Sequence, residues 1–324
     1  MSEPKMKDRI ATVLFNYGIV VVLAALVMLF SVASANFMKV FTIFTILKQI
    51  AITGVISVGS AFVIMTGGID LSVGSIAGVS SVTAAMMMMA KFPAPLACLL
   101  TVALALTYGA ISGFFVTKLN MPSLIATLGM MTALRGMAFI ISGGLPVFGF
   151  SATFGDFAKN SLWVVPYPVI LLMVIFLIAN FILNRTTIGR HVLGVGGNAE
   201  ASRLSGVNVT RVKMFAYALS GFLSGVAGLV LLSRTASGQP SAGVNYEMDA
   251  ITAVVLGGVS LNGGEGKLSL VMVGVLIMGI LSTGMIMCNI NEYVQQLVKG
   301  LVLIGAVAFS SFSSATRSRL VSMA

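Results

Sequence analysis

The sequence predicts an all-α integral membrane protein, a polytopic bundle of about ten transmembrane helices, and three observations lead to this fold class. Hydrophobic residues make up 58% of the 324 residues and charged residues only 9%, against about 25% charged in ordinary soluble domains. The mean hydropathy is +1.05. Apolar runs of roughly twenty residues recur along the chain, the helix length that a hydrocarbon core of about 30 Å needs, and they lack the period-two alternation of a membrane β-barrel.

Ten apolar segments are predicted to cross or enter the bilayer. In chain order they are residues 13–34, 50–66, 72–90, 95–116, 123–142, 164–183, 214–233, 250–259, 268–288 and 293–312. The first resembles a secretory signal, because a basic stretch precedes it and Ala33, Ser34 and Ala35 follow. Its apolar run is longer than the ~7–15 residues of a signal core. We therefore expect an uncleaved first span in a single transmembrane domain of residues 1–324.

The basic residues predict how the bundle is oriented. Positive residues collect on cytoplasmic loops, and three clusters of them lie between or beyond the apolar runs. These are Lys5, Lys7 and Arg9; Arg185, Arg190, Arg203, Arg211 and Lys213; and Arg317 and Arg319. Both termini and the loop of residues 184–213 are then cytoplasmic, and residues 143–163 form the longest external loop. The net charge of +10 is spread between apolar runs, so we expect a lipid bilayer and no nucleic acid as its surroundings.

Two glycine-rich junctions predict broken or re-entrant helices. The segment 250–259 would rise only about 15 Å as a helix, half a bilayer, and such backbone is tolerated where protein or a water-filled cavity surrounds it. The junction glycines are Gly67, Gly68, Gly74, Gly257, Gly258, Gly263 and Gly264. Both junctions share the pattern Gly-Gly-apolar-x-Leu-x-x-Gly, which fits an internal duplication and fits chance in a glycine-rich chain equally well.

Two further stripes of small residues predict close helix contacts. Gly109 and Gly113 form one stripe, and Gly221 and Gly225 form the other, at the small-xxx-small spacing of packed membrane helices. Spacing alone leaves open whether these contacts lie within one chain or between two copies.

The sequence contains no pattern typical of catalysis. The single histidine, His191, has no Cys or carboxylate close in sequence, and Cys98 and Cys288 lack metal-ligand spacing. A GxxxxGK[ST] phosphate-binding loop is absent from the sequence. We expect a protein that is not an enzyme and holds no catalytic residue, metal or cofactor of its own, so that any ATP and Mg²⁺ would bind partner subunits.

Three ionisable residues fall in or beside apolar segments, where charge is costly and often functional. Asp70 directly precedes a predicted helix, so it either caps that helix or lines a substrate pathway. Arg135 lies in the middle of a span and should pair with a carboxylate or backbone carbonyls, for structure or along the pathway. Lys299 lies in the last span, where a structural role is favoured.

The most informative polar segment is the loop of residues 184–213. It contains a possible helix cap, Asn198, followed by a helix-forming stretch over residues 199–204, which is too short to be stable alone. Glu200 and Arg203 either form a simple surface pair or belong to a coupling helix that docks on a cytoplasmic partner. The coupling residues that we predict are Asn198, Glu200, Arg203, Leu204, Ser205 and Gly206.

Four motifs, at residues 67–75, 127–136, 196–209 and 239–266, resemble the ribose-type permeases of bacterial ABC importers. The resemblance extends from about residue 37 to residue 310. It implies a multi-pass protein of the bacterial inner membrane, two permease copies, cytoplasmic ATP-binding subunits and a periplasmic sugar-binding protein. It also implies that residues 196–209 meet the ATPase. The Met-rich third span and the C-terminal tail depart from the family pattern, which leaves the substrate and the role of the tail open.

An ion-coupled secondary transporter is the alternative hypothesis, with Asp70 and Arg135 as its ion relay. The scarcity of acidic residues near the membrane interior in the first half of the chain argues against it. Pentoses, hexoses and furanose-like signalling molecules all remain open as cargo.

Overall fold

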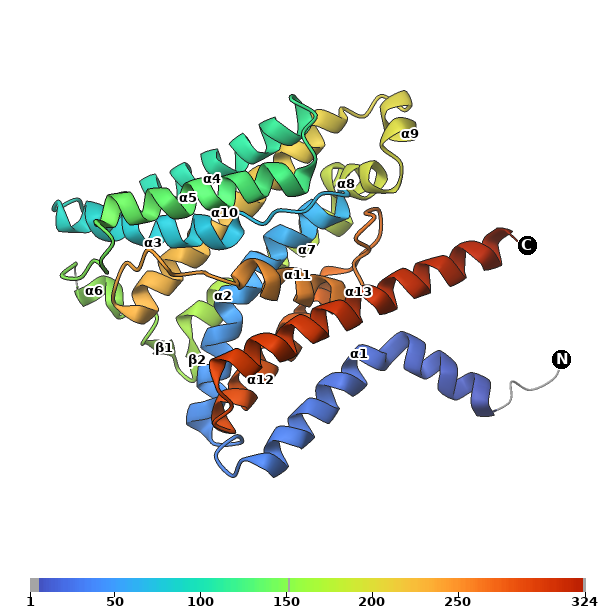
Figure 1. The fold of residues 1–324 in the computed structure, drawn as a ribbon, viewed down its shortest axis with the longest axis horizontal. Coiled ribbons are helices and arrows are strands. Elements are labelled where there is room, and N and C mark those ends of the chain that lie inside the picture. The colour runs from blue at the N-terminus through green and yellow to red at the C-terminus, as the bar shows by residue number, and fades with distance from the viewer. Residues whose placement is uncertain (1–5, 151, 323–324) are drawn as a thin grey trace.

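The computed structural model describes residues 6–150 and 152–322, and helices dominate it (Figure 1). The long helices are α1 (Met6–Ala33), α2 (Val40–Met65), α3 (Val73–Met89), α4 (Ala94–Thr117), α5 (Ser123–Ser142), α7 (Tyr167–Arg185), α10 (Val209–Thr235), α12 (Leu268–Met287) and α13 (Glu292–Ser322). The short ones are α6 (Ala152–Gly155), α8 (Thr187–Gly197), α9 (Ala199–Leu204) and α11 (Tyr246–Leu256). Two short strands, β1 (Ser161–Leu162) and β2 (Val165–Pro166), pair antiparallel.

Within the described part of the chain, seven helices are long and apolar enough to cross a membrane. They are α2, α4, α5, α7, α10, α12 and the Glu292–Ser310 part of α13. The Gly18–Ala33 part of α1 and all of α3 are shorter apolar helices. The all-α polytopic fold class that the sequence predicts is thereby confirmed.

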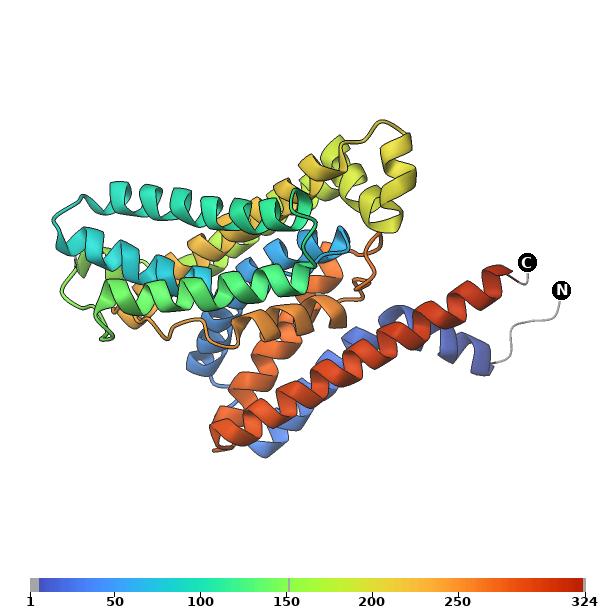
Figure 2. The same cartoon turned by 45° about the horizontal axis from the view of Figure 1, so that its top comes forward.

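The helices form two groups that meet along α2. Helices α3, α4, α5 and α10 run side by side in one group, and α1, α12 and α13 lie in the other (Figures 1 and 2). Helix α10 packs on α2, α3 and α4, whereas α12 packs on α1, α2 and α11. Because α2, α10 and α12 contact neighbours on several sides, they are the most buried of the long apolar helices.

Prolines and a glycine mark several helix ends. Helices α4, α5 and α7 begin directly after Pro93, Pro122 and Pro166, and proline suits such positions because its φ is restricted and it lacks an N–H that would need a partner. Helix α5 ends at Ser142, and the next residue, Gly143, adopts a left-handed φ of 64° that glycine reaches without steric cost. These local signals place helix boundaries close to those predicted from the sequence.

The two stripes of small residues meet each other inside one chain. Gly109 of α4 faces Gly221 of α10, and a Cβ added at Gly221 would lie 2.5 Å from the Ala105 oxygen and 2.7 Å from the Gly109 Cα. The absence of side chains lets the two backbones approach closely, which is how small residues stabilise helix pairs in membranes. The structure therefore assigns this contact to the chain itself.

Several predicted boundaries are wrong. Helix α2 begins at Val40, ten residues before the predicted span, so Lys48 lies within a helix and not in a loop. Helix α10 begins at Val209 and ends at Thr235, so Arg211, Lys213 and Arg234 also belong to it. Helix α13 extends to Ser322, beyond the predicted residue 312. Each extension adds helical turns that carry polar residues. A prediction from hydropathy does not assign such residues to a membrane span.

Most basic residues of the two terminal clusters belong to helices: Lys7 and Arg9 to α1, and Arg317 and Arg319 to α13. Lys5 lies outside the described residues. The first turn of α1 and the last turn of α13 lie at the end of the molecule that also carries α8 and α9 (Figures 1 and 2).

Candidate functional site

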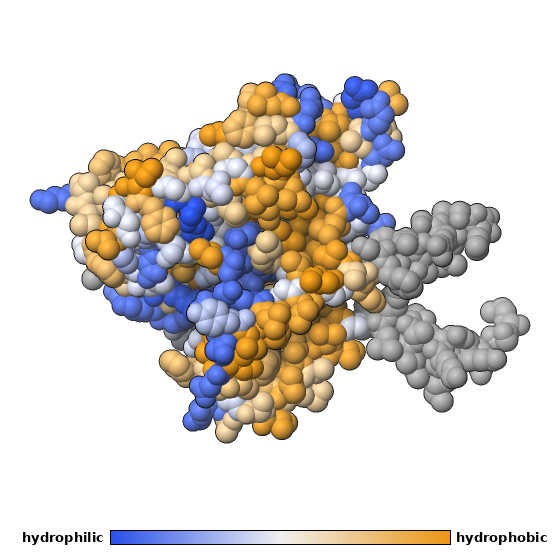
Figure 3. Space-filling model, in the orientation of Figure 1, coloured by the Kyte–Doolittle hydropathy of each residue, from blue (hydrophilic) through white to orange (hydrophobic). Residues whose placement is uncertain are grey.

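Helices α8 and α9 form a small polar projection at one end of the bundle (Figures 1 and 3). Side chains cap both helices: Thr186 Oγ1 accepts from Gly189 N at 3.4 Å, and Asn198 Oδ1 accepts from Ala201 N at 2.9 Å. The predicted helix over residues 199–204 and its predicted cap at Asn198 are confirmed. Helix α8 was not predicted, because Gly196 and Gly197, which form part of its last turn, have low helix propensity.

The predicted coupling residues lie on the exposed surface of this projection. Arg203 Nη2 contacts Glu200 Oε1 at 2.7 Å, with both side chains largely exposed. Leu204 is 79% exposed, an unusual position for a large apolar side chain at a polar tip. Ser205 Oγ donates to the Ala201 carbonyl at 2.9 Å, and Gly206 turns the chain with a φ of +85°. Helix α9 has no buried residue, and all of its residues except the partly buried Ser202 are exposed.

The projection rests on a cluster of glycines that we call the glycine junction, made of Gly67, Gly196, Gly263 and Gly264. Gly264 N donates to the Met65 carbonyl at 2.9 Å, which joins the end of α2 to the loop between α11 and α12. A Cβ at Gly196 would collide with that same Met65 oxygen and with Gly264 N. A Cβ at Gly263 would lie 2.7 Å from Gly67 N. The two glycine-rich motifs and the end of α8 therefore meet at one point.

The other predicted junction glycines also lie at crowded or tightly turned positions. A Cβ at Gly68 would lie 2.5 Å from Tyr217 Oη, and one at Gly257 would lie 2.6 Å from Val271 Cα. A Cβ at Gly74 would collide with Glu247 Oε2. Gly258 has open space beside it and a φ of +75° where α11 ends. Helix α11, with 11 residues, confirms the prediction of a short helix before this loop.

Asp70 is a buried link between the first glycine-rich loop and α10. Its Oδ1 accepts from Ser72 N at 3.0 Å and from Ser72 Oγ at 2.6 Å, and its Oδ2 accepts from Ser220 Oγ at 2.9 Å. Helix α3 begins at Val73 with Ser72 as its cap position. The hypothesis that Asp70 caps the first turn of α3 is therefore wrong, because its amide partner lies before the helix.

Arg135 holds the loop that leads into α11. Its Nη1 donates to the Pro240 carbonyl at 2.9 Å and to the Ala242 carbonyl at 2.5 Å. The carboxyl group of Glu247 lies close enough to interact electrostatically with this guanidinium. Backbone carbonyls were one of the two kinds of partner predicted for this residue. Since the hydrogen bonds of Asp70 go to Ser72 and Ser220 instead, the structure does not join Asp70 and Arg135 in one site.

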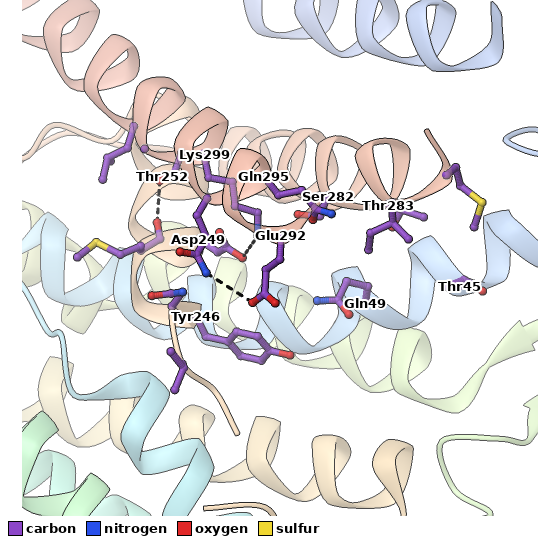
Figure 4. A pocket seen from close by; sticks show the side chains of 18 of the residues that line it. Thr45, Gln49, Tyr246, Asp249, Thr252, Ser282, Thr283, Glu292, Gln295 and Lys299 are labelled. Atoms are coloured by element: carbon purple, nitrogen blue, oxygen red, sulfur yellow. Dashed lines mark hydrogen bonds and ion pairs between the residues drawn. The ribbon is translucent and has the colours of Figure 1, made fainter. Parts of the chain in front are cut away.

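A cavity of about 670 Å³ lies between α2, α11, α12 and α13. Figure 4 shows polar side chains from all four helices pointing into it, among them Gln49, Tyr246, Ser282 and Gln295. On its wall, Lys299 Nζ contacts Asp249 Oδ2 at 2.8 Å, which agrees with the structural role favoured for Lys299. Figure 3 shows a hydrophilic area between hydrophobic surfaces on this face of the molecule.

Sequence reasoning missed two acidic residues at the start of α11. Glu247 and Asp249 are 8% and 7% exposed, and Glu247 Oε2 is buried without a hydrogen-bond partner among the described residues. The signal was a pair of acids directly before an apolar half-helix, a place where charge is expensive and therefore informative. Across the described ranges, His, Cys, Asp and Glu nowhere form a group of three that would hold a metal ion.

A multi-pass helical bundle with a cavity between its apolar helices and a polar projection at one end is typical of membrane transport proteins. A family model described as "branched-chain amino acid transport system / permease component" matches residues 42–307, and the chain belongs to this family.

Individual relatives cover nearly the whole chain. The "Ribose import permease protein RbsC" of Haemophilus influenzae is 39% identical over 90% of this chain and 92% of its own. The protein of the same name from Bacillus subtilis is 40% identical over 90% and 91%. The "L-arabinose transport system permease protein AraH" of Escherichia coli is 35% identical over 95% and 94%. No solved structure matches. The resemblance to ribose-type ABC permeases of the bacterial inner membrane is confirmed.

Proposed function

We propose that this permease imports a monosaccharide and that its ATP-binding partner subunits dock on α9. The observation that carries the proposal is that relatives named for ribose and L-arabinose match about nine-tenths of the chain, including the exposed projection. The permease performs no covalent chemistry, and ATP and Mg²⁺ bind the partner subunits.

The cargo is a sugar and not a branched-chain amino acid. The family description names amino acids, but that description covers many permeases, whereas the relatives with 35–40% identity over most of the chain are named for pentoses. Ribose and L-arabinose are therefore the first solutes to test. A periplasmic binding protein would supply high affinity, so the permease itself needs only weak binding.

Coupling runs from α9 through the glycine junction. A six-residue helix is not stable alone in water, and α9 has no buried residue within this chain, so a cleft in the ATPase would bury it. The glycine junction connects the end of α8 to the end of α2 and to the loop before α12. Movement of α9 would thus reach two membrane helices directly.

The end with α8 and α9 faces the cytoplasm in this proposal, and the end with α6 and the β1–β2 hairpin faces the periplasm. The basic residues of the projection, such as Arg190 and Arg203, agree with the preference of positive charge for the cytoplasmic side. Helices α1, α3 and α11 would join the seven long apolar helices to make ten membrane segments. The first turn of α1 and the last turn of α13 would then be cytoplasmic.

A second copy of the permease completes the proposed transporter. Helix α13 presents large apolar side chains outward, with Leu297 62% exposed, Leu301 59% and Ile304 66%. In the assembled protein this surface contacts lipid or the second copy. Rocking of the two copies against each other would expose a path first to the periplasm and then to the cytoplasm.

The test is reconstitution in proteoliposomes with the ATP-binding subunits and the binding protein. Arg203→Glu and Leu204→Ser should abolish stimulation of ATP hydrolysis and sugar uptake, while the permease inserts and folds normally. Lys118→Glu is the matched control, because Lys118 is an exposed basic residue in the loop between α4 and α5. Parental transport by both α9 variants contradicts the docking assignment.

The same vesicles separate the proposal from ion-coupled transport. Uptake that continues without ATP or ATP-binding subunits, driven by a proton or sodium gradient, would favour the ion-coupled alternative. In that case Asp70→Asn and Arg135→Met should abolish the response to the gradient.

A further inference from the structure

The cavity between α2, α11, α12 and α13 has the size of a small-molecule site. Its volume of about 670 Å³ falls inside the range of about 300–1,000 Å³ that ligand pockets occupy. Three of its walls, α2, α12 and the Glu292–Ser310 part of α13, are long and apolar enough to cross a membrane. A hollow of this size has room for a small solute that passes through the bundle.

The lining of the cavity combines polar and apolar side chains, although the helices around it are mainly apolar. Thr45 and Gln49 come from α2, Ser282 and Thr283 from α12, and Gln295 from α13 (Figure 4). Polar side chains in a membrane helix are costly unless they face protein, water or a ligand. Their convergence from three helices on one space indicates a ligand that offers hydrogen bonds.

The charged side chains that line the cavity balance in sign, because Arg234 and Lys299 are positive and Asp249 and Glu292 are negative. Lys299 pairs with Asp249 at 2.8 Å, and Arg234 donates a short hydrogen bond to Gln49 Oε1. A charged solute would have to compete with these partners. The hydroxyl and amide side chains of the lining are then the main groups that can bind a solute. Each of them both donates and accepts hydrogen bonds.

Side chains that both donate and accept hydrogen bonds match the hydroxyl groups of a sugar, because each sugar hydroxyl also donates and accepts. The ring of Tyr246 and the apolar side chains of Met248 and Ile286 line the same space and provide surface for the C–H face of a sugar ring. The cavity thus combines polar and apolar contacts in the way that ligand sites do.

We propose that this cavity, within a single permease chain, binds the transported solute and takes it as an uncharged, polyhydroxylated molecule. The inference rests on the proposed function, because it identifies where the imported sugar contacts this chain. Helix α13 forms the outer wall, and the Lys299–Asp249 pair fastens that wall to α11.

A protection experiment tests the site directly. Ser282→Cys is introduced into the full transporter in a Cys98→Ala, Cys288→Ala background, and its reaction with a small maleimide is followed. Ribose, L-arabinose or xylose should slow the reaction about tenfold, the equivalent of about 1.4 kcal/mol, and leucine should not. Thr107→Cys on α4 is the control whose labelling stays constant.

Transport provides the second readout. Gln49→Leu and Thr283→Val keep side-chain size but remove hydrogen-bonding groups, so each should lower sugar uptake about tenfold while insertion is unchanged. Thr107→Val is the matched control and should transport at the parental rate. Labelling that no sugar slows, or parental uptake by both variants, overturns the site, and equal protection by leucine overturns the solute class. If the parent protein shows no ATP-dependent uptake, the proposed function fails instead, and protection by sugars then still reports on the cavity.

Discussion

Lys299 Nζ lies 2.8 Å from Asp249 Oδ2 and joins α13 to the short helix α11. The two side chains are 24% and 9% exposed, so the pair is partly withdrawn from solvent. A pair of this kind adds little net stability compared with apolar residues, but an unpaired member is strongly destabilising. The pair therefore fixes the position of α13 relative to α11, and both helices line the cavity.

Replacing one residue of this pair should lower the stability of the protein more than replacing both. Lys299→Met or Asp249→Asn should each lower the free energy of unfolding by about 3–5 kcal/mol, and the double variant should recover most of that loss. Thermal unfolding of the purified permease in detergent measures both effects. The exposed pair Glu200 and Arg203 serves as control, because substitutions there should change stability by only about 0.2–1 kcal/mol. Additive losses in the Lys299 and Asp249 double variant would contradict a direct interaction.

The contact between α4 and α10 should not tolerate a single methyl group. In Gly221→Ala the new Cβ would meet the Ala105 oxygen at 2.5 Å and the Gly109 Cα at 2.7 Å, so the helices must separate at a cost of about 1–3 kcal/mol. Gly129→Ala on α5 is the matched control, because nothing lies within 4 Å of its added Cβ. We expect a lower unfolding temperature for Gly221→Ala alone. Equal unfolding temperatures would show that this helix contact is not close-packed.

Two adjacent glycines at the end of α8 provide a sharp test of coupling. Gly196→Ala places a Cβ against the Met65 oxygen, whereas the Cβ of Gly197→Ala lies 3.9 Å from its nearest neighbour, Gly264 Cα. We expect Gly196→Ala to displace the projection and to abolish ATP-driven uptake in reconstituted vesicles. Gly197→Ala should retain it. Similar transport by the two variants would show that force does not pass through the glycine junction.

Arg135 should order the loop that leads into α11. Replacing it in Arg135→Met removes donors to two carbonyls, so we expect faster hydrogen exchange over residues 236–245. Arg135→Lys should give an intermediate rate, because an ammonium group lacks the planar guanidinium geometry. Thr132→Val, on an exposed part of the same helix, should leave exchange unchanged. Unaltered hydrogen exchange in Arg135→Met would show that Arg135 does not order this loop.

Local sequence signals were sufficient for much of the helical pattern. Residues 123–142 were predicted as a span, and α5 covers the same residues because Pro122 and Gly143 mark its two ends. Helix α9 was also predicted with its cap, since the Asn198 side chain needs only the nearby Ala201 amide. Such features depend on contacts within a few residues, which a sequence displays directly.

The predictions failed where polar residues belong to membrane helices. Helix α2 begins at Val40 and includes Lys48 and Gln49, which interrupt the apolar run and moved the predicted start to residue 50. Gln49 is tolerated because it lines the cavity and accepts from Arg234. Hydropathy has no means of recognising a polar residue whose partner lies 185 residues away in the chain.

From the sequence alone, composition and the length of the apolar runs determined a multi-pass helical membrane protein, and its motifs determined the permease family. The tertiary structure decided that Gly109 and Gly221 meet within one chain, that Arg135 binds carbonyls, and that Lys299 pairs with Asp249. The physical reason is the same in each case. Helix formation depends on neighbouring residues, whereas these contacts depend on how helices distant in sequence pack against one another.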